Sequence, residues 1–262
     1  MDYITYAVPF FLLALLAELA YGIAIKKNTY RLNDAISNLF MGTLRTANKL
    51  IIIGAAGYVF YLAETRFALW RMDAESPITW IFAFVIYDFF YYWFHRISHE
   101  RQIFWASHAA HHQSEDYNLS TALRQTGTGA FVSWVFYIPM FLIGIPSYVF
   151  ISVASLNLVY QFWVHSEHIP KLGWYENYFV TASNHRVHHA QNEQYIDKNY
   201  GGVFIIWDRI FGTHKIEDEN EACIYGIRST LNTFNPVWAN LHMYVKIIKE
   251  MWLSKKWKDK LY

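Results

Sequence analysis

Long apolar segments are the feature that most limits how this chain of 262 residues can fold. Residues 4–25 form the first of them, and Glu18 is the one charged residue in it. A helix needs about 20 apolar residues to cross the hydrocarbon core of a bilayer. A cleaved signal peptide is the alternative, but the segment has no basic start, is too long and lacks a clear cleavage site. The sequence therefore predicts a transmembrane helix here.

Three further apolar segments follow along the chain. Residues 50–63 are short for a crossing, and residues 78–94 are rich in aromatic side chains. Residues 129–164 are too long for one crossing at about 1.5 Å per residue, and Gly144-Ile145-Pro146 interrupts them near the centre. A helical hairpin explains this last segment. We therefore expect an all-α fold, an integral-membrane helical bundle of about four to five transmembrane helices that includes the hairpin and carries a His-rich helical cap.

The composition agrees with a membrane protein. Hydrophobic residues make up 54% of the chain, aromatic residues 19% and charged residues only 16%, against about 25% charged residues in soluble domains. The net charge of +1 argues against a nucleic-acid-binding protein, because neutralising phosphates requires a basic surface. Cys223 is the only cysteine, so no intrachain disulfide can form and a metal site must use His, Asp or Glu.

Basic residues predict the orientation of the chain in the membrane. The segment after the first apolar stretch contains Lys26, Lys27, Arg31, Arg45 and Lys49. Cytoplasmic loops carry an excess of Lys and Arg, so we expect the N-terminus outside. The third crossing then ends on the cytoplasmic side at His95, and the hairpin returns the chain to that side at His165.

Eight histidines fall into three groups with helical spacing. The groups are His95 and His99; His108, His111 and His112; and His185, His188 and His189. Successive residues of a helix are about 100° apart, so residues three or four apart lie on one face. An adjacent pair points in two directions and can serve two metals, or one metal and a bridge. Imidazole is a ligand for Fe, Cu, Zn and Ni.

The number of histidines implies two metal ions. A single His-x3-His pair is commonly a product of core packing, but three groups together would bury many polar rings if they bound nothing. The set also exceeds the four ligand positions of one tetrahedral ion. Gln161 and His165 add a ninth candidate ligand, His165, because the hairpin returns it to the same side. His168 is a weaker candidate, and His214 and His242 lie outside the pattern.

Three acidic residues lie where they could orient the ligands. Asp88 is seven residues before His95, nearly two helical turns, so both lie on one helix face. A carboxylate in that position can accept the second N–H of a metal-bound imidazole. Glu100 and Asp116 adjoin the histidine groups and could act in the same way, although a solvated charge or a helix cap explains them equally well.

The pattern H-x3-H, H-x2-H-H and H-x2-H-H resembles that of the membrane-bound fatty acid hydroxylase superfamily, also called the sterol desaturase family. Within it, several stretches between about residues 80 and 245 are similar to the alkylglycerol monooxygenase group, as is the Gln161-x3-His165 element. These stretches are YDFFYYWFHRISHE, NLSTALRQ, NHRVHH, IDKNYGGV and IIWDRIFGT. The resemblance, and not the spacing, indicates which chemistry to expect.

The resemblance implies two Fe ions, O2 as co-substrate and a C–H bond of a membrane lipid as the target. In the alkylglycerol monooxygenase group, that bond lies next to an ether oxygen and tetrahydrobiopterin is the reductant. The expected partners are thus a lipid substrate and an electron donor, either a pterin or a redox protein. A sterol or other lipid desaturase with the same metals is an alternative function. A membrane metal transporter or storage protein is another, but it would place its ligands near mid-bilayer.

We expect a single domain over residues 1–262. Residues 1–77 would form N-terminal membrane helices, residues 78–215 the catalytic core, and residues 216–262 a basic tail. From residue 236 onward, the tail mixes lysines with Trp, Leu, Ile and Met. Such a segment is typical of an amphipathic helix at the membrane interface, and equally of an ordinary solvated tail.

Overall fold

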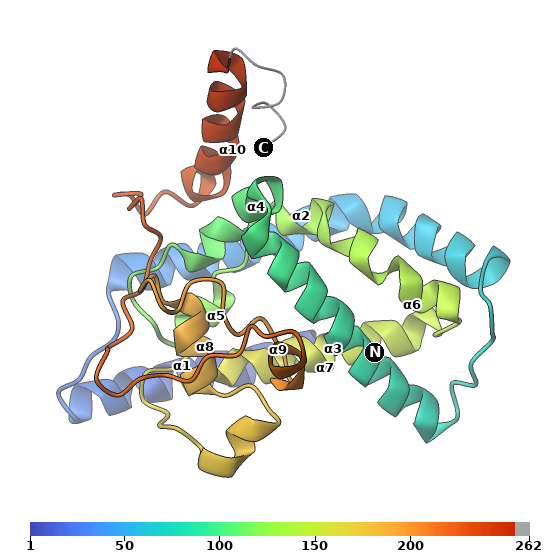
Figure 1. Cartoon of the computed structure of the whole chain (residues 1–262), viewed down its shortest axis with the longest axis horizontal. Coiled ribbons are helices and arrows are strands. Elements are labelled where there is room, and N and C mark those ends of the chain that lie inside the picture. Colours follow the sequence, from blue (N-terminus) through green and yellow to red (C-terminus); the bar gives the residue numbers. More distant parts are fainter. Residues whose placement is uncertain (255–262) are drawn as a thin grey trace.

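The computed structural model describes residues 1–254, and every regular element in this range is a helix (Figure 1). The elements are α1 (Tyr3–Ala24), α2 (Leu32–Arg66), α3 (Pro77–Glu100), α4 (Gln102–His112), α5 (Leu119–Leu123), η1 (Gly129–Phe131), η2 (Ser133–Tyr137), α6 (Ile138–Ile143), α7 (Ser147–Trp163), η3 (Gly173–Asn177), α8 (Ala182–His189), α9 (Ile206–Ile210) and α10 (Pro236–Leu253). Strand pairing among these residues is limited to two isolated bridges. The prediction of an all-α fold is confirmed.

Helices α1, α2 and α3 are each long and apolar enough to cross a membrane. Large apolar side chains on them face outward; Phe10, Ile51 and Ile81 are 70%, 70% and 67% exposed. Water would meet this surface in a soluble protein, whereas lipid tails cover it in a bilayer. The chain is therefore a membrane protein with a helical bundle, as its apolar segments predict.

Helix α2 is much longer than the apolar segment at residues 50–63. It has 35 residues, or about 52 Å at 1.5 Å per residue, against a hydrocarbon core of about 30 Å. Its first turns continue as helix because their polar residues are buried: Asn38 donates to Asp34 Oδ2 at 3.0 Å and to Ser120 Oγ of α5 at 2.9 Å. The polar half of α2 thus reaches the histidine-rich end of the molecule.

Residues 129–164 turn back on themselves, as predicted (Figure 1). Gly144 ends α6 with a left-handed φ of 102°, and a Cβ atom there would collide with the carbonyl oxygen of Trp70. Pro146 then stands at the N-cap of α7. The first arm consists of η1, η2 and α6 rather than one continuous span. The total of about four to five crossings therefore stays a prediction.

The bundle holds an apolar core between α3 and the hairpin. Tyr87 of α3 stacks on Tyr137 with ring centroids 4.8 Å apart, and Met140 and Val149 are fully buried beside them. At the far end of α3, the extended Arg101 redirects the chain into α4. The polar ends of α3, α4, α7 and α8 therefore converge at one end of the bundle (Figure 1).

Candidate metal centre

Nine histidines meet at this polar end and form two groups. The first group is His95, His99, His108, His112 and His188, and the second is His111, His165, His185 and His189. Within each group, one ring nitrogen of every histidine lies within 4.8 Å of those of the others. All nine predicted ligands are therefore brought together, and each group could hold one metal ion.

Helix geometry divides the histidines between the two groups. His95 and His99 lie one turn apart on α3 and both face the first group. The adjacent residues His111 and His112 of α4 face different groups, and so do His188 and His189 of α8. The 100° step between neighbours produces this division. Two short helices thus supply ligands to both groups.

The ring nitrogens are spaced as ligands around an ion would be. Nε2 of His108 lies 3.1 Å from Nε2 of His95 and 3.1 Å from Nε2 of His112, and the Nε2 atoms of His165 and His185 are 3.0 Å apart. Two nitrogens that bind one ion at about 2.1 Å and at a right angle lie about 3.0 Å apart.

Several ring nitrogens are buried without a partner among the described residues. In the two groups these are Nε2 of His99, His188 and His189, and Nδ1 of His185; outside them, Nε2 of His168 is also buried without a partner. A buried polar atom with no partner costs free energy, and an ion bound there would remove that cost. The donor set, its spacing and these open nitrogens all fit a pair of metal ions.

Backbone carbonyl oxygens fix the orientation of four of the rings. Nδ1 of His95, His111, His165 and His188 lies 2.8, 2.8, 2.9 and 3.0 Å from the carbonyl oxygens of Tyr200, Arg124, Gln161 and Lys198. When Nδ1–H donates to a carbonyl, Nε2 is left unprotonated and faces the centre of the group. Metal-binding histidines are commonly held in this way.

The three predicted acids make none of these contacts. Glu100 pairs with Arg96 at 2.8 Å, and Asp116 pairs with Arg31 at 2.9 Å, both away from the rings. Asp88 is fully buried but accepts hydrogen bonds from groups other than imidazoles. These three acids therefore do not contact the imidazole rings directly in this structure. Among residues 1–254, the carboxylate that lies within 4 Å of a ligand nitrogen is that of Asp197, whose Oδ1 is 3.9 Å from Nδ1 of His99.

Asp88 instead holds a chain segment that lies over the histidines, residues 198–208, which we call the closing segment. Its carboxylate accepts from the backbone N–H of Val203 at 2.8 Å and of Phe204 at 2.9 Å. Asp208 accepts from the backbone N–H of Tyr200 at 2.7 Å and of Gly201 at 2.8 Å. The closing segment supplies the carbonyls of Lys198 and Tyr200 that orient two rings.

Arg124 plays a similar part in the second group. Its side chain is 3% exposed, donates to the carbonyl of Ala110 at 2.7 Å and to Asn38 at 2.8 Å, and lies 3.6 Å from Asp34. Its own carbonyl accepts from His111. The sequence offered no signal for this role, because any residue carries a carbonyl group.

Burial keeps the imidazoles neutral, which is the form that binds metal. It is the main cause that lowers the pKa of His111 to about 4, and the guanidinium groups of Arg124 and Arg45 lower it further. Burial and neighbouring rings lower the pKa well below its ordinary value in the other ligands outside α3, which are His108, His112, His165, His185, His188 and His189.

The remaining histidines lie outside both groups. His168 packs edge-on against Tyr21 of α1, and His242 contacts the side chain of Gln113. Gln161 donates to Asn157 at 2.5 Å and contributes its carbonyl to His165, so its side chain is not turned to the metal groups.

Comparisons with known proteins agree with this arrangement. A family model described as fatty acid hydroxylase matches residues 80–213. Alkylglycerol monooxygenase from Homo sapiens is 44% identical over 97% of this chain and 56% of its own length; the Xenopus tropicalis protein is 40% identical over 99% and 58%. An ornithine lipid hydroxylase from Rhizobium tropici is 29% identical over 65% of this chain and 55% of its own.

The chain spans about half the length of the curated relatives it matches. No solved structure matches it significantly. The matched range of the family model nonetheless covers half of the chain and includes all nine histidines of the two groups. The chain therefore belongs to the fatty acid hydroxylase family.

Proposed function

We propose that this chain is a non-haem di-iron monooxygenase that uses O2 to hydroxylate a C–H bond of a membrane lipid. The observation that carries the proposal is the pair of adjacent, buried histidine groups at one end of a membrane bundle. The similarity to alkylglycerol monooxygenases makes an alkylglycerol the first substrate to test, with the carbon next to its ether oxygen as the position that is hydroxylated.

The nine histidines of the two groups would hold the metal ions. An iron pair, when bound, supplies the reduction of dioxygen, while the protein supplies position and dryness. The carbonyl oxygens of Tyr200, Arg124, Gln161 and Lys198 keep the Nδ1 protons in place, so that Nε2 faces the metals. The closing segment covers the rings and limits the access of water. Hydroxylation puts one oxygen atom into the lipid and releases the other as water, so the donor must supply two electrons and two protons.

The electron donor is part of the proposal. Tetrahydrobiopterin is the first candidate and a redox protein the second. We also propose that residues 1–77 anchor the chain, that residues 78–215 form the catalytic core, and that residues 216–262 form a cytoplasmic or interfacial tail. The active site would face the cytoplasm and the N-terminus the outside, because Lys26, Lys27 and Arg31 follow α1 on the same side as the histidines.

Purified, iron-loaded protein tests the proposal directly. We expect about two irons per chain and oxygen consumption when the protein is given alkylglycerol with tetrahydrobiopterin. Sterol and fatty-acyl substrates and other reductants are run in parallel. Hydroxylation of the ether-adjacent carbon of an alkylglycerol gives a hemiacetal, which breaks down, so mass spectrometry should show a fatty aldehyde and a glycerol. A sterol or fatty-acyl substrate should instead carry one added oxygen atom, and a loss of two hydrogens would indicate a desaturase.

Single histidine variants complete the test. His188→Ala and His189→Ala each remove a ligand from a different group and should each lower the iron content and abolish lipid oxidation. His214→Ala is the matched control, because His214 lies in neither group. If the protein binds iron but oxidises none of the lipids with any reductant, the proposed enzymatic function is wrong, and metal transport or storage is favoured.

A further inference from the structure

Helix α10 projects beyond the other helices of the described chain (red in Figure 1). One of its faces packs on α4, where Met243 contacts Ala106 and Ala109, and Ile247 packs beside them. The same α4 carries His108, His111 and His112. This attachment fixes α10 next to the metal groups and leaves its opposite face without a protein partner among the described residues.

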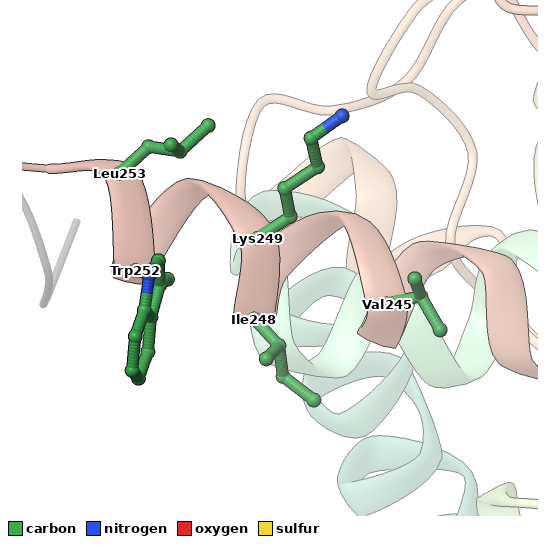
Figure 2. A pocket seen from close by; sticks show the side chains of 5 residues that line it. All are labelled: Val245, Ile248, Lys249, Trp252 and Leu253. Carbon is green, nitrogen blue, oxygen red and sulfur yellow. The ribbon is translucent and has the colours of Figure 1, made fainter.

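A regular apolar stripe lies on this opposite face. Its members follow one another at intervals of three, four, three and four residues, so they line one side of the helix. They are Trp238, Leu241, Val245, Ile248 and Trp252, which are 42%, 44%, 48%, 64% and 86% exposed. Figure 2 shows Ile248 and Trp252 pointing to the same side, while Lys249 points away from them. A shallow surface hollow is lined by Val245, Ile248, Lys249, Trp252 and Leu253.

We propose that α10 lies in the headgroup region of an anionic bilayer, with this stripe in contact with the acyl chains. Helices α1, α2 and α3 anchor the chain in the membrane, and α10 runs crosswise to α1 and α2 in Figure 1. A helix with this orientation at the polar end of the bundle lies along the membrane surface rather than across it. The inference does not depend on the reaction that the metal centre catalyses.

The distribution of side chains supports a lipid surface as the partner. Trp238 and Trp252 stand at the two ends of the stripe, and Trp is enriched where headgroups meet acyl chains. Lys246 and Lys249 lie beside the stripe, where long basic side chains can reach anionic headgroups. The sequence after Ser254 adds Lys255, Lys256, Lys258 and Lys260. The basic residues of α10 and of the sequence that follows it complement an anionic surface.

The interface has a consequence for the metal centre. Because α10 packs directly on α4, contact with the bilayer would hold the histidines of α4 at the level of the lipid headgroups. A lipid could then reach the histidine groups without leaving the membrane.

Spin labels at single cysteines test the proposal in the full chain. Cys223→Ser removes the only native cysteine, and labels are placed at Val245→Cys, Ile248→Cys and Trp252→Cys on the stripe. Lys246→Cys and Glu250→Cys on the polar side of α10 are the matched controls. In vesicles of phosphatidylcholine and phosphatidylglycerol, collisions with O2 report lipid and collisions with a nickel chelate report water.

We expect the stripe labels to collide mainly with O2, and the control labels mainly with the nickel chelate. Stripe labels that collide freely with the chelate would overturn the proposal. Stripe labels shielded from both reagents would overturn it too, because they would indicate that a second copy of the chain covers the stripe. In vesicles of phosphatidylcholine alone, the ratio of O2 collisions to chelate collisions at the stripe labels should fall at least twofold. The double variant Lys246→Gln and Lys249→Gln should show the same fall in anionic vesicles. Equal immersion in both vesicle types would refute the role of anionic lipid.

Discussion

Single hydrogen bonds decide which nitrogen of each histidine faces the metals. The Nδ1 atoms of four ligand rings lie against backbone carbonyls, and two of these carbonyls belong to the closing segment. The position of that segment depends in turn on the buried carboxylates of Asp88 and Asp208. Both acids therefore act on the histidines through the backbone.

Asp88→Asn tests this role. The carboxylate accepts from four donors, Asn157 Nδ2, Val203 N, Phe204 N and Trp207 Nε1, at 2.7 to 3.1 Å. Asn keeps the shape but offers one acceptor oxygen and turns an NH2 group toward donors. Each donor left unpaired should cost about 1–3 kcal/mol of the free energy of unfolding. Thermal unfolding in detergent and metal retention against a chelator measure the two effects.

Glu100→Gln is the matched control for Asp88→Asn. Glu100 pairs with Arg96 at the surface, and exposed pairs contribute about 0–1 kcal/mol. The control should leave stability and metal retention near those of the parent protein. Equal losses in the two variants would refute the separate role of Asp88.

Arg124→Gln should be strongly destabilising. The guanidinium is buried against Asp34 at 3.6 Å, and removing one partner of a buried pair costs about 3–5 kcal/mol. The carbonyl that holds His111 would also shift, so we expect metal loss from the second group first. Denaturant unfolding and iron content measure both. Arg31→Gln is the control, because the Arg31 side chain is 47% exposed beside Asp116 and should cost about 0–1 kcal/mol; a comparable loss there would contradict this account.

At the scale of elements, the closing segment requires glycine where it passes over α3. A Cβ atom on Gly202 would lie 2.8 Å from Asp88 Oδ1 and 3.0 Å from Gln161 Nε2. Both side chains are held by other hydrogen bonds, which moving away from the Cβ atom would disturb. Gly202→Ala should therefore cost about 1–3 kcal/mol and lower metal content.

Gly54→Ala in α2 is the control for Gly202→Ala. A Cβ atom on Gly54 would meet no atom within 4 Å, and Ala favours a helix over Gly by about 1 kcal/mol. Thermal unfolding should show this variant to be at least as stable as the parent. A Gly202→Ala protein with unchanged melting and iron content would disprove the close contact.

The helices and histidine groups were predictable from sequence because they follow local rules. Apolar length predicted α1 and α3, and helical spacing predicted the three histidine groups. The 100° step left open whether His111 and His112 serve two metals or one metal and a bridge. The early start of α2 was missed because its polar residues are buried by α5, a contact between distant parts of the chain. Asp88 was predicted to accept from an imidazole on its face of α3. It accepts instead from the backbone of the closing segment, which lies against that face. The carbonyl groups that orient the rings could not be predicted, because every residue has a backbone carbonyl.

At the scale of the whole molecule, the buried histidines should make stability depend on pH. In the unfolded chain their pKa is about 6.5, whereas in the folded chain burial lowers the pKa of His111 to about 4 and that of the six other ligands outside α3 in the same direction. Below pH 6.5 the unfolded state therefore binds more protons, and folding becomes less favourable as the pH falls. Burial acts oppositely on Asp208, whose raised pKa of about 6 adds stability as the pH falls through 6.

The seven histidines outweigh that carboxyl group, so metal-free protein should melt at progressively lower temperature from pH 7 to pH 5. Each histidine contributes at most about 1.4 kcal/mol per pH unit. Thermal unfolding of chelator-treated protein across this range measures the slope. A melting temperature that stays constant or rises on acidification would show that the rings are not buried as neutral groups.

The orientation of the bundle in the membrane gives the last prediction. Lys27 follows α1 at the histidine-rich end, and Glu75 lies in the loop between α2 and α3 at the opposite end. If basic residues keep the first loop in the cytoplasm, a membrane-impermeant maleimide should label Glu75→Cys in intact cells and Lys27→Cys only after permeabilisation, both in a Cys223→Ser background. Both side chains are exposed, so labelling reports the side of the membrane rather than burial. The reverse pattern would place the histidine groups outside, where a cytoplasmic electron donor could not reach them.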